Sequence, residues 1–390
     1  MQQQLTEGFK KVFETDGDNL RLFFAPGRVN LIGEHIDYNG GLVLPCALDK
    51  GTYVAINQRD DDVIRLASST FNPIVSISKN NLAFDPDHGW ANYPKGVASC
   101  LIELGHKLTG FDMYIIGDLP NGAGLSSSAS ISMAVAVTLN NVFGLGISSI
   151  EMARLCQKAE FYNGVNCGIM DPFASAMGKK DHAILLDCNT LEYSHVPLTL
   201  GDYRIVIANT NKRRGLADSQ YNERRRECEE ALKDLKKVRD INALCDLSLE
   251  EFEKHKHIIS DKVSCRRAEH AVYENHRTKK AAEYLTAGKW NELADTMIKS
   301  HESLRDLYEV SCNELDSLVR HAYAHGKIPG NPPIYGGRMT GAGFGGCTVN
   351  IVHKDYTDSF AEYVGGQYER DTNKKASFYV ASPGDGAKEI

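Results

Sequence analysis

The sequence predicts a fold that mixes strands with helices and is divided into two domains. Its 390 residues are too many for one ordinary hydrophobic core, so two domains are expected. Residues 111–143 predict a strand, a glycine- and serine-rich turn and a buried helix in succession. Near residue 200 this composition gives way to a mainly helical one. We therefore predict an N-terminal domain over residues 1–195 and a C-terminal domain over residues 196–390.

The first three elements follow one another directly. FDMYIIGDLP (111–120) predicts a strand, because aliphatic and aromatic residues run together until Pro120 stops them. NGAGLSSSAS (121–130) predicts a turn, and ISMAVAVTLNNVF (131–143) is apolar on most faces, as is typical of a buried helix. A second helix is predicted over 148–162, where Ser148 and Glu151 form a capping-box pattern.

Two further elements are predicted in the second half of the chain. Residues 221–240 predict an amphipathic helix with solvated charges. The apolar side of this helix is marked at three- and four-residue steps by Cys228, Leu232, Leu235 and Val238. GGRMTGAGFGGCTVNIV (336–352) contains a second glycine-rich loop, and its residues 347–352 alternate like a strand.

The composition excludes several classes of protein. With 42% hydrophobic residues, 24% charged residues and a net charge of -7, the chain does not suit broad neutralisation of nucleic-acid phosphates. No apolar run reaches the roughly 18 residues that span a bilayer, and the N-terminus lacks a secretory pattern. The ten cysteines include no C-x-x-C pair and no zinc-like spacing. We expect a reduced, cytoplasmic enzyme without nucleic-acid or membrane partners.

The turn at 121–130 has the features of an anion-binding site. Backbone N–H groups of a glycine turn and of the following helix start favour a phosphate. Gly122 and Gly124 permit close approach, and the serines add hydroxyl donors or a magnesium ligand. A serine-capped helix after a flexible segment would explain the same residues.

Two common phosphate-binding motifs do not apply to this chain. It contains no Walker A motif and no HRD or DFG triplet. A G-x-G-x-x-G pattern occurs at Gly341, Gly343 and Gly346, but the strand-like CTVNIV follows it where a dinucleotide site needs a helix. A kinase with this sequence would therefore have another fold.

Two carboxylates lie among apolar residues. Glu160 shares a helical stripe with Ala153 and Cys156 at the negative end of a helix dipole, where burial of an anion is costly. Mg²⁺ held jointly with a serine hydroxyl would compensate; a glutamate turned into water is the alternative. Asp171 suits a base tuned by its apolar surroundings. The alternative is a helix N-cap before Pro172, a role that does not exclude catalysis.

Four motifs together carry a resemblance to a known family: GRVNLIGEHIDYNGG (27–41), NGAGLSSSAS (121–130), NCGIMDPFAS (166–175) and GGRMTGAGFGG (336–346). They resemble the galactokinases, which belong to the small-molecule (GHMP) kinase superfamily with homoserine, mevalonate and phosphomevalonate kinases. The resemblance extends from about residue 20 nearly to the C-terminus, and the first motif is the galactokinase signature.

The resemblance implies a fold and an activity. The fold has two α/β domains with the active site in the cleft between them, in a monomer or weak dimer. The activity transfers the γ-phosphoryl group of Mg-ATP to the C1 hydroxyl of α-D-galactose, giving galactose 1-phosphate and ADP, the first committed step of galactose metabolism.

The resemblance also implies roles for individual residues. Asp171 would be the base facing the C1 hydroxyl, while Arg28 would stabilise charge on the transferring phosphoryl group and orient Asp171. The residues implied to bind the sugar are Glu34, His35, Ile36, Asp37, Gly168 and Tyr221, with Asn39 as a weaker candidate. Those implied to bind ATP are Ser68, Gly122, Ala123, Gly124, Leu125, Ser126, Ser127 and Ser128. Ser128 and Glu160 would bind Mg²⁺.

The chain departs from the family pattern at three places. Ile36 stands where threonine is common and is expected to face the core. Pro172 replaces a glutamine that usually follows the catalytic aspartate, and the segment between Glu160 and Asp171 is one residue shorter than usual. The last two changes could alter rate or sugar preference.

Two alternative functions remain open from the sequence. One is a kinase for another sugar C1 hydroxyl, such as that of N-acetylgalactosamine. The other is a non-catalytic sensor of galactose and ATP. The uninterrupted serine loop at 126–130, together with Arg28 and Asp171, favours a kinase over a sensor.

Overall fold

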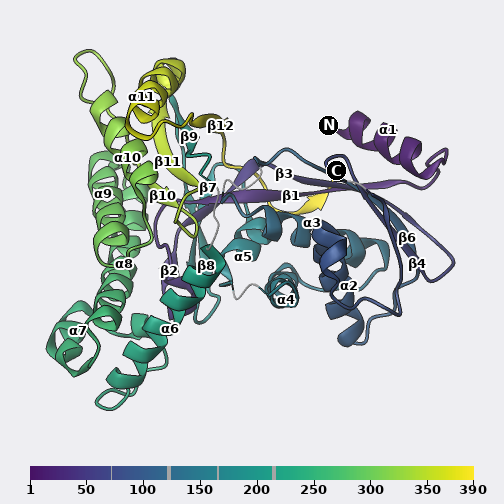
Figure 1. Cartoon of the computed structure of the whole chain (residues 1–390), viewed down its shortest axis with the longest axis horizontal. Coiled ribbons are helices and arrows are strands. Elements are labelled where there is room, and N and C mark those ends of the chain that lie inside the picture. Colours follow the sequence, from purple (N-terminus) through teal and green to yellow (C-terminus); the bar gives the residue numbers. More distant parts are fainter. Residues whose placement is uncertain (72, 121–123, 165–166, 213–216) are drawn as a thin grey trace.

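The computed structural model describes residues 1–71, 73–120, 124–164, 167–212 and 217–390 (Figure 1). It mixes helices with three β-sheets, as the sequence predicts. The boundary between residues 195 and 196 stays a prediction. Within the described ranges, no helix is both long and apolar enough to cross a bilayer.

The largest sheet has six strands in the order β13-β1-β3-β6-β4-β5. Neighbours are antiparallel except β4 and β6, which run parallel. Its strands are β1 (Arg21–Asn30), β3 (Pro45–Gln58), β4 (Val63–Ser68), β5 (Val75–Ser78), β6 (Phe111–Gly117) and β13 (Lys388–Glu389). Strand β6 confirms the strand predicted over 111–120 as far as Gly117, three residues before Pro120, and β13 returns the C-terminal end of the chain to the edge of this sheet.

Helices cover both faces of the six-stranded sheet. Figure 1 shows α1 (Gln2–Phe13) over one face and, against the other, a group of four helices. This group comprises α2 (Asn92–Glu103), α3 (Ser127–Val142), α4 (Ser149–Tyr162) and α5 (Met170–Met177). Because side chains alternate along a strand, Val54 and Ile56 of β3 join the core under α3, whereas Ala55 packs with Phe9 of α1.

The predicted helices of this half are present, with one shifted start. Helix α4 has the predicted capping box: the Ser148 hydroxyl accepts from the Glu151 N–H, and the Glu151 carboxylate accepts from the Ser148 N–H. Helix α3 begins at Ser127, so the prediction of a turn through residue 130 is wrong for its last residues. Ser130 can be buried in a helix because its hydroxyl donates to the carbonyl of Ala25 on β1, at 2.9 Å.

The remaining strands form two smaller sheets. One is antiparallel in the order β10-β11-β9-β12, and the other has the order β2-β7-β8. The strands are β2 (Leu42–Val43), β7 (His182–Asp187), β8 (Tyr193–Pro197), β9 (Tyr203–Asn209), β10 (Arg338–Thr340), β11 (Cys347–His353) and β12 (Ser377–Ala381). Strand β11 confirms the strand predicted over 347–352, although it is buried on both faces rather than on one.

Helices dominate the second half, as predicted. They are α6 (Ala217–Leu235), α7 (Leu249–His255), α8 (Lys262–Thr286), α9 (Trp290–Asp306), α10 (Asn313–His325) and α11 (Thr357–Thr372). Helix α6 buries Cys228 and Leu235, as predicted. The prediction for Val238 is wrong: a turn with a Val238 N–H to Leu235 carbonyl bond follows the helix, and Val238 is 44% exposed.

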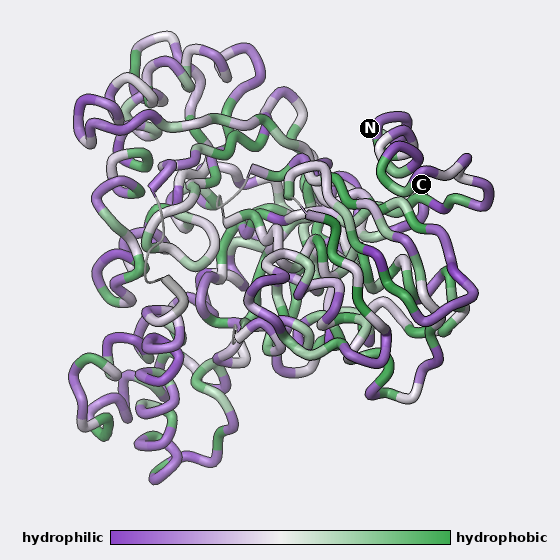
Figure 2. Tube along the Cα trace, turned by 45° about the vertical axis from the view of Figure 1, so that its right-hand side comes forward, coloured by the Kyte–Doolittle hydropathy of each residue, from purple (hydrophilic) through white to green (hydrophobic). Residues whose placement is uncertain are grey.

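Short 3₁₀ segments connect these elements, and the core runs through both halves. The segments are Asp37–Asn39, Pro86–Ala91, Leu244–Asp246, Lys256–Ile258 and Lys354–Tyr356. In Figure 2 the hydrophobic stretches gather between the large sheet and its helices and again inside the helical half. The polar side chains that the sequence predicts for sugar and ATP binding are therefore expected at the edges of these cores.

Candidate active site

One cavity of about 820 Å³ collects residues from both halves of the chain. Its walls come from the end of β1 and the loop after it, the first turns of α3 and α5, the end of α4, α6 and the glycine-rich loop after β10. The predicted residues that line it are Arg28, Glu34, His35, Asp37, Ser128, Glu160, Gly168, Asp171 and Tyr221. Segments far apart in sequence thus meet in one hollow, as the resemblance implies.

Arg28 and Asp171 form the central pair of the cavity. The pairing of β1 with β3 shifts between Pro26 and Arg28, and such a bulge redirects the side chains beside it. Nε and Nη2 of Arg28 each lie 2.7 Å from a different oxygen of Asp171, while Nη1 donates to the carbonyl of Gly124 at 2.9 Å. Arg28 is only 3% exposed. Burial lowers the pKa of Arg28, but the negative charges of Asp171, Glu34 and Asp37 raise it by more. The net pKa is above the usual value, so the guanidinium stays charged.

A third group fixes Asp171 from the start of α3. The Ser126 hydroxyl donates to Asp171 Oδ2 and does not cap its own helix. Asp171 itself lies in the first turn of α5, whose N-cap is Ile169, so the alternative of Asp171 as the N-cap is wrong. A carboxylate in the first turn of a helix is favoured by the helix dipole.

Asp37 is pressed against Gly168 in the same cavity. A Cβ added at Gly168 would lie 1.7 Å from Asp37 Oδ2, so only glycine leaves room for this carboxylate. Burial and the charge of Asp171 raise the pKa of Asp37 to about 7, against the opposing effect of backbone N–H donors from Tyr38 and Met170. Near neutral pH, Asp37 can therefore either accept or donate a hydrogen bond.

The His35 ring is held at both nitrogens. Nε2 lies 3.1 Å from the Ala342 carbonyl, and Nδ1 lies 2.8 Å from the Tyr38 hydroxyl. Burial, reinforced by His270, lowers the pKa of His35 to about 3, so the ring is neutral. A carbonyl only accepts, so Nε2 carries the proton and Nδ1 accepts from Tyr38. A sugar hydroxyl can reach either nitrogen only by sharing or displacing one of these bonds.

Glu34 and Tyr221 complete the predicted sugar group. Glu34 Oε1 accepts from the Gly341 N–H at 2.7 Å and lies 3.5 Å from Nη1 of the fully buried Arg338. The Tyr221 ring packs 5.4 Å from the rings of both His35 and Tyr38, measured between centroids. Burial raises the pKa of Tyr221 well above its usual value, so its hydroxyl keeps its proton.

Two other residues of this group lie outside the cavity. Ile36 is fully buried in the hydrophobic core and does not line the cavity, so its expected place in the core is confirmed and the implied contact of its side chain with the sugar is wrong. Asn39 is also buried, and its Nδ2 donates to the His35 carbonyl at 2.9 Å. These side chains support the loop that carries the sugar group, and neither faces the cavity.

Glu160 and Ser128 suit a divalent cation. Glu160 is 2% exposed, which excludes the alternative of a glutamate turned into water. Its Oε1 has no hydrogen-bond partner among the described residues. Burial raises the pKa of Glu160 to about 7, a bond from Ser128 acts in the opposite direction, and Asp171 raises it further. A lone carboxylate oxygen beside a hydroxyl fits Mg²⁺, which usually takes one or two carboxylates together with substrate phosphates.

A second cavity of about 800 Å³ meets the first at Ser128. Ser68 and Ser127, both predicted for ATP, line it together with Phe71 and Trp90, whose rings stack at a centroid distance of 6.3 Å. Aromatic and aliphatic walls with a few hydroxyls suit a nucleobase and its sugar.

The remaining predicted loop residues are placed differently. Gly124 has φ +74° and contributes its carbonyl to Arg28, and Leu125 is buried with its carbonyl accepting from the Arg28 N–H. Gly122 and Ala123 lie outside the described residues. The described part of the loop therefore positions Arg28 as well as opening α3.

Sequence reasoning missed several residues of the first cavity. They are Ala129, Cys167, Met170, Pro172, Asn222, Gly341 and Ala342. The glycine-rich motif at 336–346 was a signal for Gly341 and Ala342. It was compared with a dinucleotide-binding motif and was not assigned to the sugar site. Tyr38, inside the first motif, was also missed, although its hydroxyl contacts His35.

Comparisons with known proteins identify the family. The galactokinase galactose-binding signature matches residues 7–58, the N-terminal domain of GHMP kinases matches residues 92–179, and their C-terminal domain matches residues 281–370. A galactokinase of Fusobacterium nucleatum is 52% identical over 100% of both chains. A galactokinase of Bacillus subtilis is 48% identical over 100% of this chain and 99% of its own.

Solved structures agree with this assignment. The crystal structure of Lactococcus lactis galactokinase complexed with galactose has a TM-score of 0.95 and 43% identity, with full coverage of both chains. A mevalonate kinase structure has a TM-score of 0.66 at 18% identity, covering 93% of this chain and 98% of its own, and thereby shows the shared fold. The chain belongs to the galactokinase family of GHMP kinases.

Proposed function

We propose that this chain transfers the γ-phosphoryl group of Mg-ATP to the C1 hydroxyl of α-D-galactose, giving α-D-galactose 1-phosphate and ADP. The observation that carries the proposal is the two-pronged Arg28–Asp171 pair, which lies in a cavity lined by Glu34, His35 and Asp37. The neighbouring cavity, which shares Ser128 with the first, supports a nucleotide site beside the sugar. Membership of the galactokinase family supports the same reaction.

The polar groups of the first cavity suit a hexose. A sugar is a ring of hydroxyl groups, so its recognition needs fixed donors and acceptors at the edge of a core. A sugar that lacks a hydroxyl would lose its hydrogen bond to a buried group such as Glu34 or Asp37, and such a loss costs more than a missing methylene. Ile36 and the neighbouring aliphatic residues anchor the loop so that these groups stay in place.

The reaction requires positioning and charge neutralisation more than covalent chemistry by the protein. The C1 oxygen would form a bond to the γ-phosphorus as the bond to the ADP oxygen breaks. Asp171 would accept the proton of the C1 hydroxyl, and Arg28 would neutralise charge on the transferring group while holding Asp171 in place. Mg²⁺ bound through Ser128 and Glu160 would supply further neutralisation of the phosphates.

An assay of ADP release across a panel of sugars tests this function. With purified chain and Mg-ATP, we expect galactose to be turned over in preference to glucose and N-acetylgalactosamine. Faster turnover of another sugar would replace galactose as the substrate. Saturable galactose binding without ADP release would identify a sensor and contradict the proposal.

Glu160→Gln should raise the Mg²⁺ concentration needed for half-maximal activity by about 10-fold, because a buried amide replaces an anionic ligand. A magnesium titration at saturating galactose and ATP measures this. Glu103→Gln is the matched control, since Glu103 forms an exposed ion pair with Lys158 away from both cavities. An unchanged titration in Glu160→Gln would count against its role in metal binding.

Gly168→Ala should raise the KM for galactose by about 10-fold, because the new Cβ forces the Asp37 carboxylate out of its position. Misplacing a group that positions the substrate is costly even when the shift is small. The KM for ATP should change little. Gly366→Ala on α11, where no atom of the described residues lies within 4 Å of the added carbon, controls for a general effect of the substitution. Equal galactose kinetics in the two variants would show that Asp37 does not depend on the space at Gly168.

A further inference from the structure

A line of side-chain hydrogen bonds leads from the sugar cavity into the helical half of the chain. His35 Nδ1 lies 2.8 Å from the Tyr38 hydroxyl, which lies 2.8 Å from the Tyr308 hydroxyl. The Tyr308 oxygen lies 3.1 Å from Cys228 Sγ on α6. Tyr308 and Cys228 are almost completely buried, and neither lines the cavity.

The direction of each hydrogen bond in this line follows from its His35 end. His35 Nε2 must donate to the Ala342 carbonyl, so Nδ1 accepts from Tyr38. The Tyr38 oxygen then accepts from Tyr308. The Tyr308 oxygen in turn is left to accept from the Cys228 thiol. Each hydroxyl has one donor role and one acceptor role, so the line has a single consistent arrangement.

We propose that Tyr308 is a positioning residue that fixes the His35 ring in the sugar cavity and thereby sets the affinity for galactose. The proposal rests on the proposed function, because it assigns His35 to the wall that the sugar contacts. The Tyr308 side chain acts on the ring through Tyr38 and through packing. Its own ring lies between His35 and His270, at centroid distances of 5.0 and 4.5 Å.

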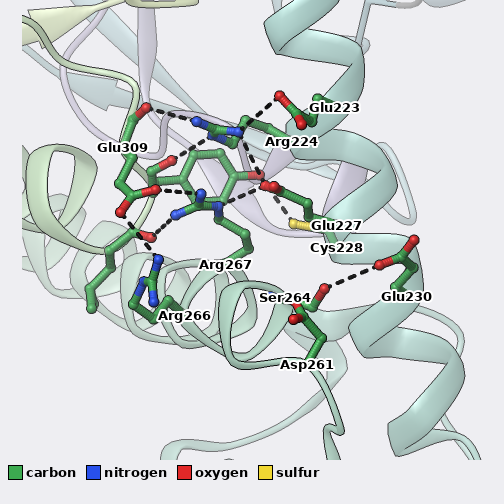
Figure 3. A network of polar contacts seen from close by, with 12 residues as sticks. Glu223, Arg224, Glu227, Cys228, Glu230, Asp261, Ser264, Arg266, Arg267 and Glu309 are labelled. Atoms are coloured by element: carbon green, nitrogen blue, oxygen red, sulfur yellow. Dashed lines mark hydrogen bonds and ion pairs between the residues drawn. The ribbon is translucent and has the colours of Figure 1, made fainter.

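Two buried arginines hold the turn that carries Tyr308 (Figure 3). Arg224 of α6 donates to the carbonyls of Tyr308 and Glu309, at 2.8 and 3.1 Å. Arg267 of α8 donates to the carbonyl of Leu307. Three successive carbonyls after α9 are thus bound by guanidinium groups. Glu309 has φ +54°, a conformation that a residue other than glycine keeps only where its surroundings enforce it.

The charges of these arginines are balanced inside the same network. Arg267 donates from Nε to Glu227 Oε2 at 2.7 Å and from Nη2 to Glu309 Oε2 at 2.6 Å. Arg224 also lies 3.3 Å from the Glu227 carboxylate. In Figure 3 the guanidinium groups of Arg224 and Arg267 lie between Glu309 on one side and Glu227 on the other. Because the guanidinium groups of Arg224 and Arg267 are buried and every one of their nitrogens is hydrogen-bonded, they hold the backbone that they bind.

The same turn also reaches the other side of the His35 ring. The Val310 carbonyl accepts from the Phe344 N–H at 2.7 Å, and a Cβ at Gly343 would lie 2.2 Å from that carbonyl. The glycine-rich loop is therefore packed directly on the turn. Because Ala342 of this loop accepts from His35 Nε2, both nitrogens of the ring are held by groups that depend on residues 307–310.

Kinetics of Tyr308→Phe in the full chain test the proposal. The substitution removes one hydroxyl and keeps the ring between His35 and His270. We expect the KM for galactose to rise roughly 5-fold, the loss of one buried hydrogen bond, with the KM for ATP unchanged and kcat within about 2-fold. Tyr38→Phe should give a similar selective rise, and the double variant should be no worse than the more affected single variant, since both act on the same ring.

Tyr368→Phe is the matched control. Tyr368 is also fully buried, and its hydroxyl donates to the Thr210 carbonyl at 2.7 Å, but it packs in α11 away from the cavity. This variant should lose stability without a change in the KM for galactose. A similar KM in Tyr308→Phe and the unsubstituted chain would overturn the proposal, as would an equal rise in the KM for ATP.

Two further results separate the possible failures. If Tyr308→Phe does not fold, Tyr38→Phe decides the matter, and a normal KM for galactose in that variant overturns the proposal. If the unsubstituted chain itself releases no ADP with galactose, the proposed function fails before the role of Tyr308 is reached.

Discussion

Asp171→Asn should lower kcat by about 10³-fold while galactose binding stays measurable, because a positioned general base contributes roughly 10²–10⁴-fold. Asparagine keeps the shape of the side chain and one acceptor oxygen, so the hydroxyl of the sugar still finds a partner. It cannot accept the proton of the C1 hydroxyl. It also gives up one of the two bonds from Arg28, which leaves a buried cation that Glu34 and Asp37 neutralise from a greater distance.

Two measurements separate the chemical effect from a loss of structure. Isothermal titration with galactose should still show binding by Asp171→Asn, and thermal unfolding should show a folded chain. Asp371→Asn is the control, because Asp371 pairs with Arg320 and His321 on α10, away from both cavities. Near-normal turnover by Asp171→Asn would remove Asp171 from the role of base.

Arg28→Lys should lower kcat by about 10²-fold, and Arg28→Gln should lower it further, because charge and geometry are lost in two steps. Lysine keeps the positive charge but cannot reach both oxygens of Asp171 and the Gly124 carbonyl at once. Glutamine also removes the charge, which leaves Asp171 and the transferring group without neutralisation.

The control for this series is Arg65→Lys. Arg65 on β4 binds both oxygens of Asp112, so the same substitution removes a similar two-pronged pair that lines neither cavity. Its kcat should stay near that of the unsubstituted chain. Equal activity of Arg28→Lys and Arg28→Gln would contradict a charge-neutralising role for Arg28.

Local patterns in the sequence predicted what local forces decide. The capping box at Ser148 and Glu151 is present because both partners lie within one turn of helix. The burial of Glu160 follows from its place on the helical stripe. The prediction that Val238 lies on the apolar side of the helix was wrong, because hydrophobic periodicity does not show where a helix ends. A turn follows Leu235 and ends this helix.

Contacts between distant segments could not be predicted in the same way. Arg28 and Asp171 are 143 residues apart, and only the resemblance to galactokinases, not a physical pattern, indicated that they meet. The state of the His35 ring depends on Tyr308 and Ala342, which belong to parts of the chain whose positions follow from the packing of α9 and β10. Ser126 was expected to bind phosphate, and its bond to Asp171 depends on how α3 and α5 begin side by side.

A crystal structure with galactose, Mg²⁺ and a non-hydrolysable ATP analogue would test most directly whether the two cavities bring sugar and triphosphate together. We expect the C1 hydroxyl within hydrogen-bond distance of Asp171, the terminal phosphate beside Arg28, and the metal ion between Ser128 and Glu160. Galactose bound elsewhere, or held here with its C1 hydroxyl turned away from Asp171, would contradict this arrangement.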